Sequence, residues 1–303
     1  MAQSFFAQGK LLITGEYFVL DGSTALAIPT KKGQHLSVEK NELGEHQWQG
    51  LDAQKREWFS ASFDRSLEIK NTSDHAIAEK LQSILRFIKS LAPDKFLEFH
   101  SFTTKLEFER AWGWGSSSTM IALLSEWADV DAYTVLLNTI GGSGYDLACA
   151  KAKGPIFYSL KHEGPQTQKA PFPKQFLDQL FLVYLGQKQS SESEVNEYRK
   201  RGSADPSLIR QISQTTMMTA KSGDLSTFVA CLQELERITG DYLGRQPVQE
   251  RLFSALPGAA KSLGAWGGDF VLLATPWDEQ KVKDYCNDLG FSTVFPFKEV
   301  VKL

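Results

Sequence analysis

A short stretch in the first half of the chain combines glycines with hydroxyl side chains. It reads Ala111-Trp112-Gly113-Trp114-Gly115-Ser116-Ser117-Ser118-Thr119 and leads into an amphipathic segment over residues 117–127. Glycines let the backbone turn sharply and approach a ligand closely. A helix that follows presents unpaired N–H groups to an anion, and serine hydroxyls add donors or a ligand for Mg²⁺. The pattern fits a phosphate cradle, and it also fits a plain loop whose serines cap the helix.

Two familiar phosphate-binding signatures are not met. Walker A requires G-x-x-x-x-G-K-[ST], but Gly9-Lys10 is followed by Leu11 and has Ser4 at the first glycine position. The dinucleotide fingerprint G-x-G-x-x-G fails because Ser118 stands at its last position. Neither a P-loop NTPase nor a Rossmann dehydrogenase is supported.

Two more glycine clusters and one lysine are candidates for chemistry. The cluster Gly141-Gly142-Ser143-Gly144 precedes Asp146, whose carboxylate either accepts a proton from a substrate hydroxyl or caps its helix. The cluster Gly264-Ala265-Trp266-Gly267-Gly268 opens onto an apolar strand and either lines a ligand or turns the chain. Lys10 either meets a phosphate and lowers the pKa of a hydroxyl, or is an ordinary surface lysine.

The elements that must position these residues follow from hydrophobic periodicity. Helical spacing predicts helices over residues 73–91, 117–127, 132–139, 145–151, 206–222, 225–243 and 277–289. Apolar or alternating runs predict strands over residues 10–14, 17–20, 25–29, 34–39, 95–108, 155–160, 180–185, 270–274 and 292–297, and residues 41–57 read as a polar loop. The polar, proline-containing stretch 161–173 predicts a boundary near residue 162, with an α+β arrangement beyond it.

Composition narrows the class of protein. The 303 residues are 42% hydrophobic and 23% charged, which is typical of a globular protein of one or two domains. A net charge of −3 argues against a nucleic-acid binder. Three widely spaced cysteines, no signal-peptide pattern and no run long enough to span a bilayer predict a soluble cytoplasmic protein with no membrane partner.

Taken together, the segments resemble the GHMP kinase superfamily, named for galactokinase, homoserine kinase, mevalonate kinase and phosphomevalonate kinase. The family's P-G-K-x-x-x-x-G-E segment is similar to Gln8–Glu16, and its G-L-G-S-S-A loop to Gly113–Ser118. Its S-G-x-D turn matches Ser143–Asp146, and its G-A-G-G-G segment is similar to Gly264–Gly268. The four segments occur in family order and cover most of the chain.

The resemblance implies a role for each segment. Asp146 would face the acceptor hydroxyl as base, and Lys10 would depress the pKa of that hydroxyl. Ser117 would also be a Mg²⁺ ligand. The ATP phosphates would be held by Gly113, Trp114, Gly115, Ser116, Ser117 and Ser118. Substrate or cleft positions would be Glu16, Ser143, Gly144, Gly264, Ala265, Gly267 and Gly268.

The resemblance also implies a fold and an activity. The fold would be a two-domain α+β GHMP kinase fold, with an N-terminal α/β domain like ribosomal S5 domain 2 over residues 1–162 and a ferredoxin-like α+β domain over residues 163–303. The activity would be ATP- and Mg²⁺-dependent phosphorylation of a small acidic metabolite, with mevalonate first among the substrates. Phosphomevalonate kinase, a diphosphomevalonate decarboxylase-like enzyme and a non-catalytic ligand-binding homologue stay open as alternatives, and so does a homodimer.

The chain departs from the family pattern at several positions. Gln8 replaces proline, and Trp114 and Trp266 replace a leucine and a glycine, where an indole would narrow the cleft or stack on a base. Mevalonate kinases place a Mg²⁺-binding Glu before the Asp, but residues 133–139 contain no acid. A phosphomevalonate substrate would need cations, for which Lys188, Lys200 and Arg201 are the candidates.

Overall fold

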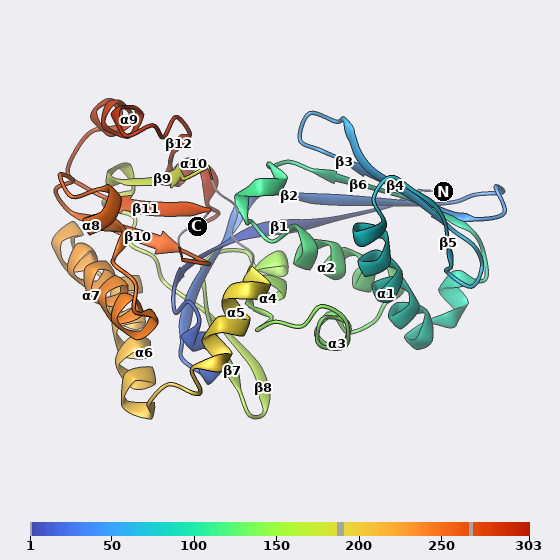
Figure 1. Ribbon diagram of the computed structural model, residues 1–303, viewed down its shortest axis with the longest axis horizontal. Coiled ribbons are helices and arrows are strands. Elements are labelled where there is room, and N and C mark those ends of the chain that lie inside the picture. Colours follow the sequence, from blue (N-terminus) through green and yellow to red (C-terminus); the bar gives the residue numbers. More distant parts are fainter. Residues whose placement is uncertain (1, 187–190, 267–268) are drawn as a thin grey trace. The chain divides into compact units, whose positions relative to one another are not determined.

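The computed structural model describes residues 2–186, 191–266 and 269–303 (Figure 1). The helices are α1 His75–Leu91, α2 Ser116–Ala128, α3 Ala132–Asn138, α4 Tyr145–Lys151, α5 Ser191–Lys200, α6 Pro206–Ala220, α7 Leu225–Leu243, α8 Val248–Leu252, α9 Glu279–Asp288 and α10 Phe297–Val300, with 3₁₀ turns η1 Phe18–Asp21, η2 Pro93–Phe96, η3 Arg110–Trp112 and η4 Leu177–Gln179. The strands are β1 Gln3–Thr14, β2 Ala25–Lys40, β3 His46–Leu51, β4 Glu57–Phe63, β5 Ile69–Thr72, β6 His100–Leu106, β7 Ile156–Lys161, β8 Gly164–Lys169, β9 Leu180–Tyr184, β10 Ala259–Leu263, β11 Phe270–Ala274 and β12 Val294–Pro296.

The strands form two sheets. The larger has eight strands in the order β5-β4-β3-β6-β2-β7-β8, with β1 also paired to β2. Within it β3 and β6 run parallel, while β6 and β7 are both antiparallel to β2. The smaller sheet has the order β10-β11-β9-β12 and is antiparallel. This mixture of helices and two sheets confirms the predicted α+β class.

Contacts between residues divide the chain into two compact units. The first unit comprises residues 1–9, 32–110 and 114–151, and the second comprises residues 10–31, 111–113 and 152–303. Residues 10–31, from the start of the chain, therefore group with its C-terminal half. The predicted division into domains 1–162 and 163–303 stays a prediction.

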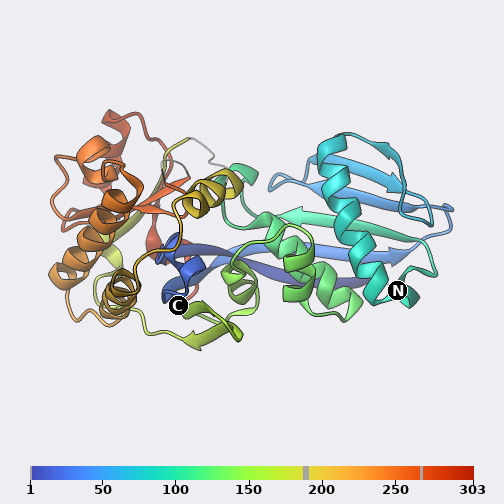
Figure 2. The same cartoon turned by 60° about the horizontal axis from the view of Figure 1, so that its bottom comes forward.

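The core of the first unit lies beneath α1 and α2. The predicted helix at 73–91 is confirmed as α1, whose Asp74 carboxylate caps it by accepting from the Ile77 N–H at 3.1 Å. Its buried face consists of Ala78, Leu81, Ile84, Leu85 and Ile88, and Ile77 is partly buried beside it. They pack with buried side chains of β4, β6 and α2, and Figures 1 and 2 show α1 lying across the strands of this unit.

The second unit is built on the small sheet and on α7. Every residue of β10 and β11 is buried, as is most of β9. Helix α7 begins at its cap residue Asp224, ends at Gly244 in the left-handed conformation, and packs against α6 and β10. In Figure 1, α6 and α7 lie side by side.

Two local predictions are wrong. Residues 17–20 do not form a strand: Tyr17 is the N-cap residue of the 3₁₀ turn η1, residues 18–20 lie within the turn, and Gly22 closes it in the left-handed conformation. Residues 46–51 form strand β3 rather than a loop. In β3 the inward positions, His46, Trp48 and Gly50, alternate with outward glutamines, so the period of two was hidden by polar composition.

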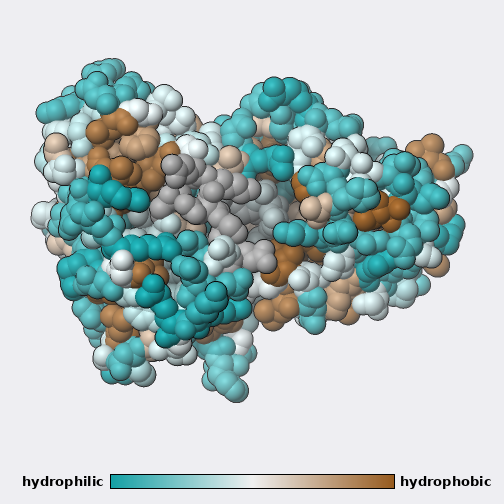
Figure 3. Space-filling model, in the orientation of Figure 1, coloured by the Kyte–Doolittle hydropathy of each residue, from teal (hydrophilic) through white to brown (hydrophobic). Residues whose placement is uncertain are grey.

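The surface on the side shown in Figure 3 is mostly hydrophilic, with hydrophobic side chains in small groups. Scattered exposed apolar residues are normal for a folded chain. Among the described residues, no helix combines the length and the hydropathy needed to cross a bilayer.

Candidate active site

The predicted phosphate loop ends at the N-terminus of α2. Gly115 is the N-cap residue and adopts the left-handed conformation, with φ 85°. The serines therefore occupy the first turn of the helix instead of capping it, and no side chain of the N-cap residue occupies the first N–H groups. Ser117 is exposed, and Ser116 and Ser118 are half-buried. This end of α2 can receive a phosphate through backbone N–H groups and hydroxyls.

Trp114 anchors this loop in the first unit. Its side chain is 2% exposed and packs against Phe108, with 5.5 Å between the ring centroids. An indole buried in this way cannot stack on a nucleotide base. The Trp114 side chain therefore holds the loop to the core of the first unit.

Gly113 belongs to the second unit and lies against an acid. It has φ 65°, and a methyl group built on its Cα would lie 2.0 Å from Oδ2 of Asp269. Asp269 is buried, at 8% exposure. Glycine suits this position best, because its backbone conformation is left-handed and any side chain would have to displace the Asp269 carboxylate.

The Ser143–Asp146 segment starts a second short helix in the first unit. Gly144 adopts φ 83°, and its carbonyl accepts from the N–H groups of Leu147 and Ala148 at 3.1 and 3.2 Å. Asp146 lies in the first turn of α4 and is half-buried. Helix α4 packs against α2. The structure thus brings the serine loop and the predicted base onto two neighbouring helices of one unit.

The first predicted segment runs along β1 into the second unit. Lys10 is half-buried on β1. Gly15 turns the chain with φ 88°, and a methyl group built on its Cα would lie 2.7 Å from the Cα of Ala25. Glu16 is 2% exposed and lies in the interior. Its role as a substrate or cleft residue stays a prediction, and the contact that the structure gives it is with Lys261.

Glu16, Lys261 and Glu236 form a buried charged triad. The ammonium of Lys261, which is 0% exposed, donates to Oε1 of Glu16 at 2.5 Å and lies 4.0 Å from Oε2 of Glu236. Glu236 in turn accepts from the Val248 N–H and from the N–H and hydroxyl of Ser262. Two carboxylates share one ammonium inside the unit.

Burial dominates the electrostatics of the triad. Desolvation raises the pKa of Glu16 to about 7, although Lys261 pulls it down. Desolvation also raises the pKa of Glu236, against the opposing charge of Lys261 and three hydrogen bonds. Near neutral pH the triad therefore tends to retain a proton, because a second unbalanced negative charge in the interior would be costly.

The last predicted segment follows β10. Gly264 has φ 69°, Gly264 and Ala265 are half-buried, and the Trp266 side chain is 4% exposed. As with Trp114, this indole is packed in the core and cannot stack on a base. Gly267 and Gly268 lie outside the described residues, so their predicted role stays a prediction.

Sequence reasoning missed the residues that hold these segments together. Lys261 interrupts the apolar strand 259–263, and Glu236 falls among the apolar positions of α7. A charged residue at a core position of each pattern was the available signal that the two would pair. Glu194 and Arg245 form an ion pair at 2.7 Å in the same unit and have no such signal, because they lie in polar sequence.

Of the three cations considered for a second phosphate, Arg201 is bound to another part of its own unit. The guanidinium of Arg201 donates to the carbonyls of Tyr242 and Leu243 at 3.2 and 2.9 Å, where it caps the end of α7. Lys200 is exposed, and Lys188 lies outside the described residues.

The predicted Mg²⁺ ligand, Ser117, lies in the first turn of α2. Within the described ranges, no group of three or more His, Cys, Asp or Glu side chains could hold a metal ion. The exposed hydroxyl of Ser117 fits a Mg²⁺ ligand only where phosphate oxygens supply most of the coordination, which is how Mg²⁺ is commonly bound with nucleotides.

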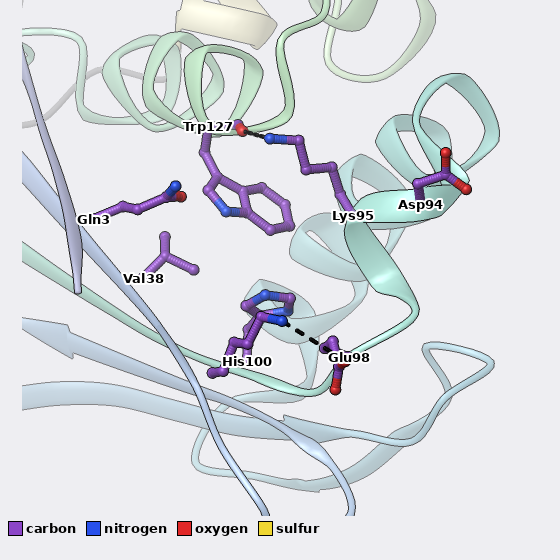
Figure 4. Close-up of a pocket in the computed structure, with 8 residues that line it drawn as sticks. Gln3, Val38, Asp94, Lys95, Glu98, His100 and Trp127 are labelled. Atoms are coloured by element: carbon purple, nitrogen blue, oxygen red, sulfur yellow. Dashed lines mark hydrogen bonds and ion pairs between the residues drawn. The ribbon is translucent and has the colours of Figure 1, made fainter. Parts of the chain in front are cut away.

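A separate cavity of about 240 Å³ lies in the first unit (Figure 4). Lys95 borders it and donates to the Trp127 carbonyl at 2.8 Å, while Lys40 and Glu98 form an ion pair at 3.7 Å. None of the residues predicted for the kinase site lines it; its walls are Gln3, Val38, Lys40, Asp94, Lys95, Glu98, His100 and Trp127.

The chain is similar to known proteins in its fold and not in a sequence match. No protein-family model matches the chain, and no curated protein matches it by sequence. Solved structures do match. The Lin0012 protein of Listeria innocua has a TM-score of 0.74 and 17% identity, and the match covers 98% of this chain and 97% of that one.

Two kinases of known name match over similar lengths. The mevalonate kinase of Methanococcus jannaschii has a TM-score of 0.71 at 16% identity, with 97% of each chain covered. The phosphomevalonate kinase of Streptococcus pneumoniae, solved with phosphomevalonate and AMPPNP, has a TM-score of 0.71 at 17% identity, covering 97% of this chain and 99% of that one. A galactokinase and a heptose 1-phosphate kinase also match. This chain therefore has, over nearly its whole length, the fold shared by the GHMP kinases.

Proposed function

We propose that this chain is an ATP-dependent kinase that phosphorylates a hydroxyl of a small acidic metabolite, with mevalonate as the first candidate. The observation that carries the proposal is the position of the G-x-G-S-S-S segment in a kinase fold. That segment ends at the start of α2, where glycine leaves the first-turn N–H groups without a side-chain cap. The S-G-x-D segment begins α4, which packs on α2.

Phosphoryl transfer depends mainly on positioning and on neutralising charge. In the proposed reaction, ATP supplies the phosphoryl group and the N–H groups and serines at the start of α2 hold its phosphates. The exposed hydroxyl of Ser117 would ligate Mg²⁺. Asp146 would accept the proton of the acceptor hydroxyl, and Lys10 would stabilise the oxygen as it becomes negative.

Phosphomevalonate is the second candidate substrate. Tyr17 after Glu16, and Asp269 after the last glycines, are similar to the segments of phosphomevalonate kinases. The engagement of Arg201 with the end of α7 speaks for mevalonate, because a second phosphate would need nearby cations.

An assay of ADP release tests the proposal. Purified protein with Mg-ATP would be offered mevalonate, phosphomevalonate, homoserine and galactose, and we expect the highest kcat/KM with mevalonate. Release of CO₂ from diphosphomevalonate would instead assign the decarboxylase alternative. The absence of turnover with every acceptor, together with binding of AMPPNP, would contradict the kinase and favour the ligand-binding alternative.

A further inference from the structure

Tyr17, which follows Glu16 in the second unit, has an unusual backbone. Its φ is 63° and its ψ −54°, and the Phe18 N–H donates to the carbonyl of Glu16 at 2.7 Å. A three-residue turn with a positive φ at its centre is rare and strained. Such a conformation persists only where surrounding contacts hold it.

The side chain of Tyr17 supplies those contacts. Its ring is buried and stacks on Tyr198, with 5.5 Å between centroids. Its hydroxyl donates to Oε2 of Glu194 at 2.9 Å and accepts from the Trp266 N–H at 2.9 Å. Burial raises the pKa of Tyr17, so the phenol stays protonated and can make both bonds at once.

Glu194 is fixed in turn by Arg245. The guanidinium donates to the two oxygens of Glu194 at 2.7 and 3.3 Å, and it also reaches the Trp266 carbonyl at 3.5 Å. Both polar groups of the Trp266 backbone are therefore bound by one network, the N–H by Tyr17 and the carbonyl, more weakly, by Arg245.

The neighbouring Glu16 binds the same stretch of chain at its other end. It pairs with Lys261 on β10 at 2.5 Å, five positions before Trp266. The two residues of the strained turn thus bind both ends of the segment 261–266, Glu16 at Lys261 and Tyr17 at Trp266. Gly264, with φ 69°, and Ala265 lie within this segment. Glycine has no side chain that would restrict its backbone dihedral angles, so neighbouring contacts must fix the path of the chain here.

We propose that Tyr17 is a positioning residue, whose hydroxyl fixes the Trp266 peptide and thereby the backbone of Gly264 and Ala265 for the phosphoryl transfer. The proposal rests on the proposed kinase function and on the substrate-side role that the GHMP resemblance implies for Gly264 and Ala265. Tyr17 itself does not touch the reacting atoms; it acts through the segment that it holds.

Tyr198 offers a matched control. It too is a buried tyrosine in the same apolar cluster, and its hydroxyl also binds a carboxylate, donating to Oδ2 of Asp21 at 2.5 Å. Tyr17→Phe and Tyr198→Phe therefore each remove one buried hydroxyl from one cluster. Only Tyr17→Phe removes the acceptor of the Trp266 N–H.

Two measurements on the full-length chain decide the proposal. Hydrogen exchange, read by NMR, should show the protection of the Trp266 amide falling about tenfold in Tyr17→Phe and staying unchanged in Tyr198→Phe. With the preferred acceptor, kcat should fall roughly 10- to 100-fold in Tyr17→Phe alone, with KM for ATP close to that of the wild type.

Each other result overturns the proposal. Unchanged protection of the Trp266 amide in Tyr17→Phe would show that the Tyr17 hydroxyl does not hold this peptide. Lost protection of the Trp266 amide with unchanged kcat would show that the hydrogen bond exists but plays no part in the reaction. An equal fall of kcat in both variants would indicate general loosening. A wild-type chain without turnover would refute the proposed function and the positioning role with it, while the exchange data would still decide whether the Tyr17 hydroxyl holds the Trp266 peptide.

A second variant covers the case in which Tyr17→Phe does not fold. Glu194→Gln keeps an oxygen that can accept from Tyr17 but removes one of the two carboxylates that hold Arg245, leaving Glu197 at 3.3 Å. Protection of Trp266 should then fall by a smaller factor, about threefold. Full wild-type protection of the Trp266 amide in Glu194→Gln would contradict the role of Glu194 and Arg245 in holding this peptide.

Discussion

Lys261 is a lysine without exposed surface, held between two glutamates that are almost as deeply buried. An ammonium in this position must be paired, and losing one partner of such a pair is far more costly than losing a surface ion pair. The surplus carboxylate is balanced most simply by a proton. The triad should therefore make the stability of the chain depend on pH.

The direction of that dependence follows from Glu16. Its pKa is about 7 in the folded chain, against 4.5 ordinarily. Between these values the folded chain binds more protons than the unfolded one, so the free energy of unfolding should fall as pH rises through this window, by an amount on the order of 3 kcal/mol. Urea denaturation of wild type and Glu16→Gln from pH 4.5 to 8 measures it, and the variant should show a flatter curve.

Glu234 provides the control for this titration. It lies on the same helix as Glu236 but is solvent-facing, and its hydrogen bond with Arg237 lowers its pKa. Glu234→Gln should keep the wild-type slope over the same pH range. Identical slopes for wild type and Glu16→Gln would show that Glu16 does not carry the proton.

Asp146 is the residue on which the proposed chemistry depends most. Asp146→Asn should lower turnover by about 10²- to 10⁴-fold, because an amide cannot accept the proton of the acceptor hydroxyl. Calorimetry with AMPPNP should show nucleotide binding retained. Asp131→Asn is the control, since Asp131 caps α3 by accepting from the Thr134 N–H at 2.7 Å and asparagine caps equally well. Wild-type turnover in Asp146→Asn would show that Asp146 is not the catalytic base.

At the scale of elements, the loop before α2 depends on the fit between Gly113 and Asp269. Gly113→Ala forces a side chain into a left-handed residue and against the carboxylate of Asp269. Gly141 has nearly the same φ, 69°, but nothing within 4 Å of an added methyl group. Gly141→Ala therefore isolates the backbone cost from the cost of the clash.

Urea denaturation should separate the two costs. Gly141→Ala should lower the free energy of unfolding by about 1 to 2 kcal/mol. Gly113→Ala should lower it by a further 1 to 3 kcal/mol or so, because the buried acid must move. In an Asp269→Ala background that further loss should disappear. Equal losses for the two single glycine variants would mean that Asp269 does not constrain the loop.

Many of the helices and strands could be predicted from the sequence. Helices such as α1 and α7 have apolar residues at helical spacing, and short apolar runs such as β9 and β11 are typical of buried strands. Strand β3 and the turn at Tyr17 could not be predicted in the same way. The first hides its alternation behind glutamines, and the second is held by Glu194 and Trp266, which lie 177 and 249 positions away. The serine loop and Asp146 could be proposed from spacing and family resemblance, but the contacts that support them are long-range.

At the scale of the whole molecule, the second unit needs residues from both ends of the sequence. A fragment of residues 163–303 would lack Glu16, leaving Lys261 with one glutamate 4.0 Å away. It would also lose Tyr17 and Phe18 from the cluster that they form with Tyr198, Ile238 and Trp266. We therefore expect this fragment alone to show no cooperative unfolding transition by circular dichroism.

Co-expression with residues 1–162 supplies the control. The two fragments together contain every contact of the second unit, so they should associate and regain a cooperative transition. A cooperative transition of 163–303 by itself would contradict the expectation and favour an independent C-terminal domain.

The pairing of Glu16 with Lys261 also has a consequence for biosynthesis. The two residues are separated by 245 positions, so the first leaves the ribosome long before its partner exists. At ordinary bacterial or eukaryotic rates of elongation the interval is roughly 10 to 50 s. Until Tyr198 and the cluster residues after it have been made, Tyr17 and Phe18 have no cluster to enter, and the nascent chain carries an apolar segment that chaperones can recognise. Slow codons late in the message would lengthen this vulnerable period, whereas slow codons before residue 10 would not.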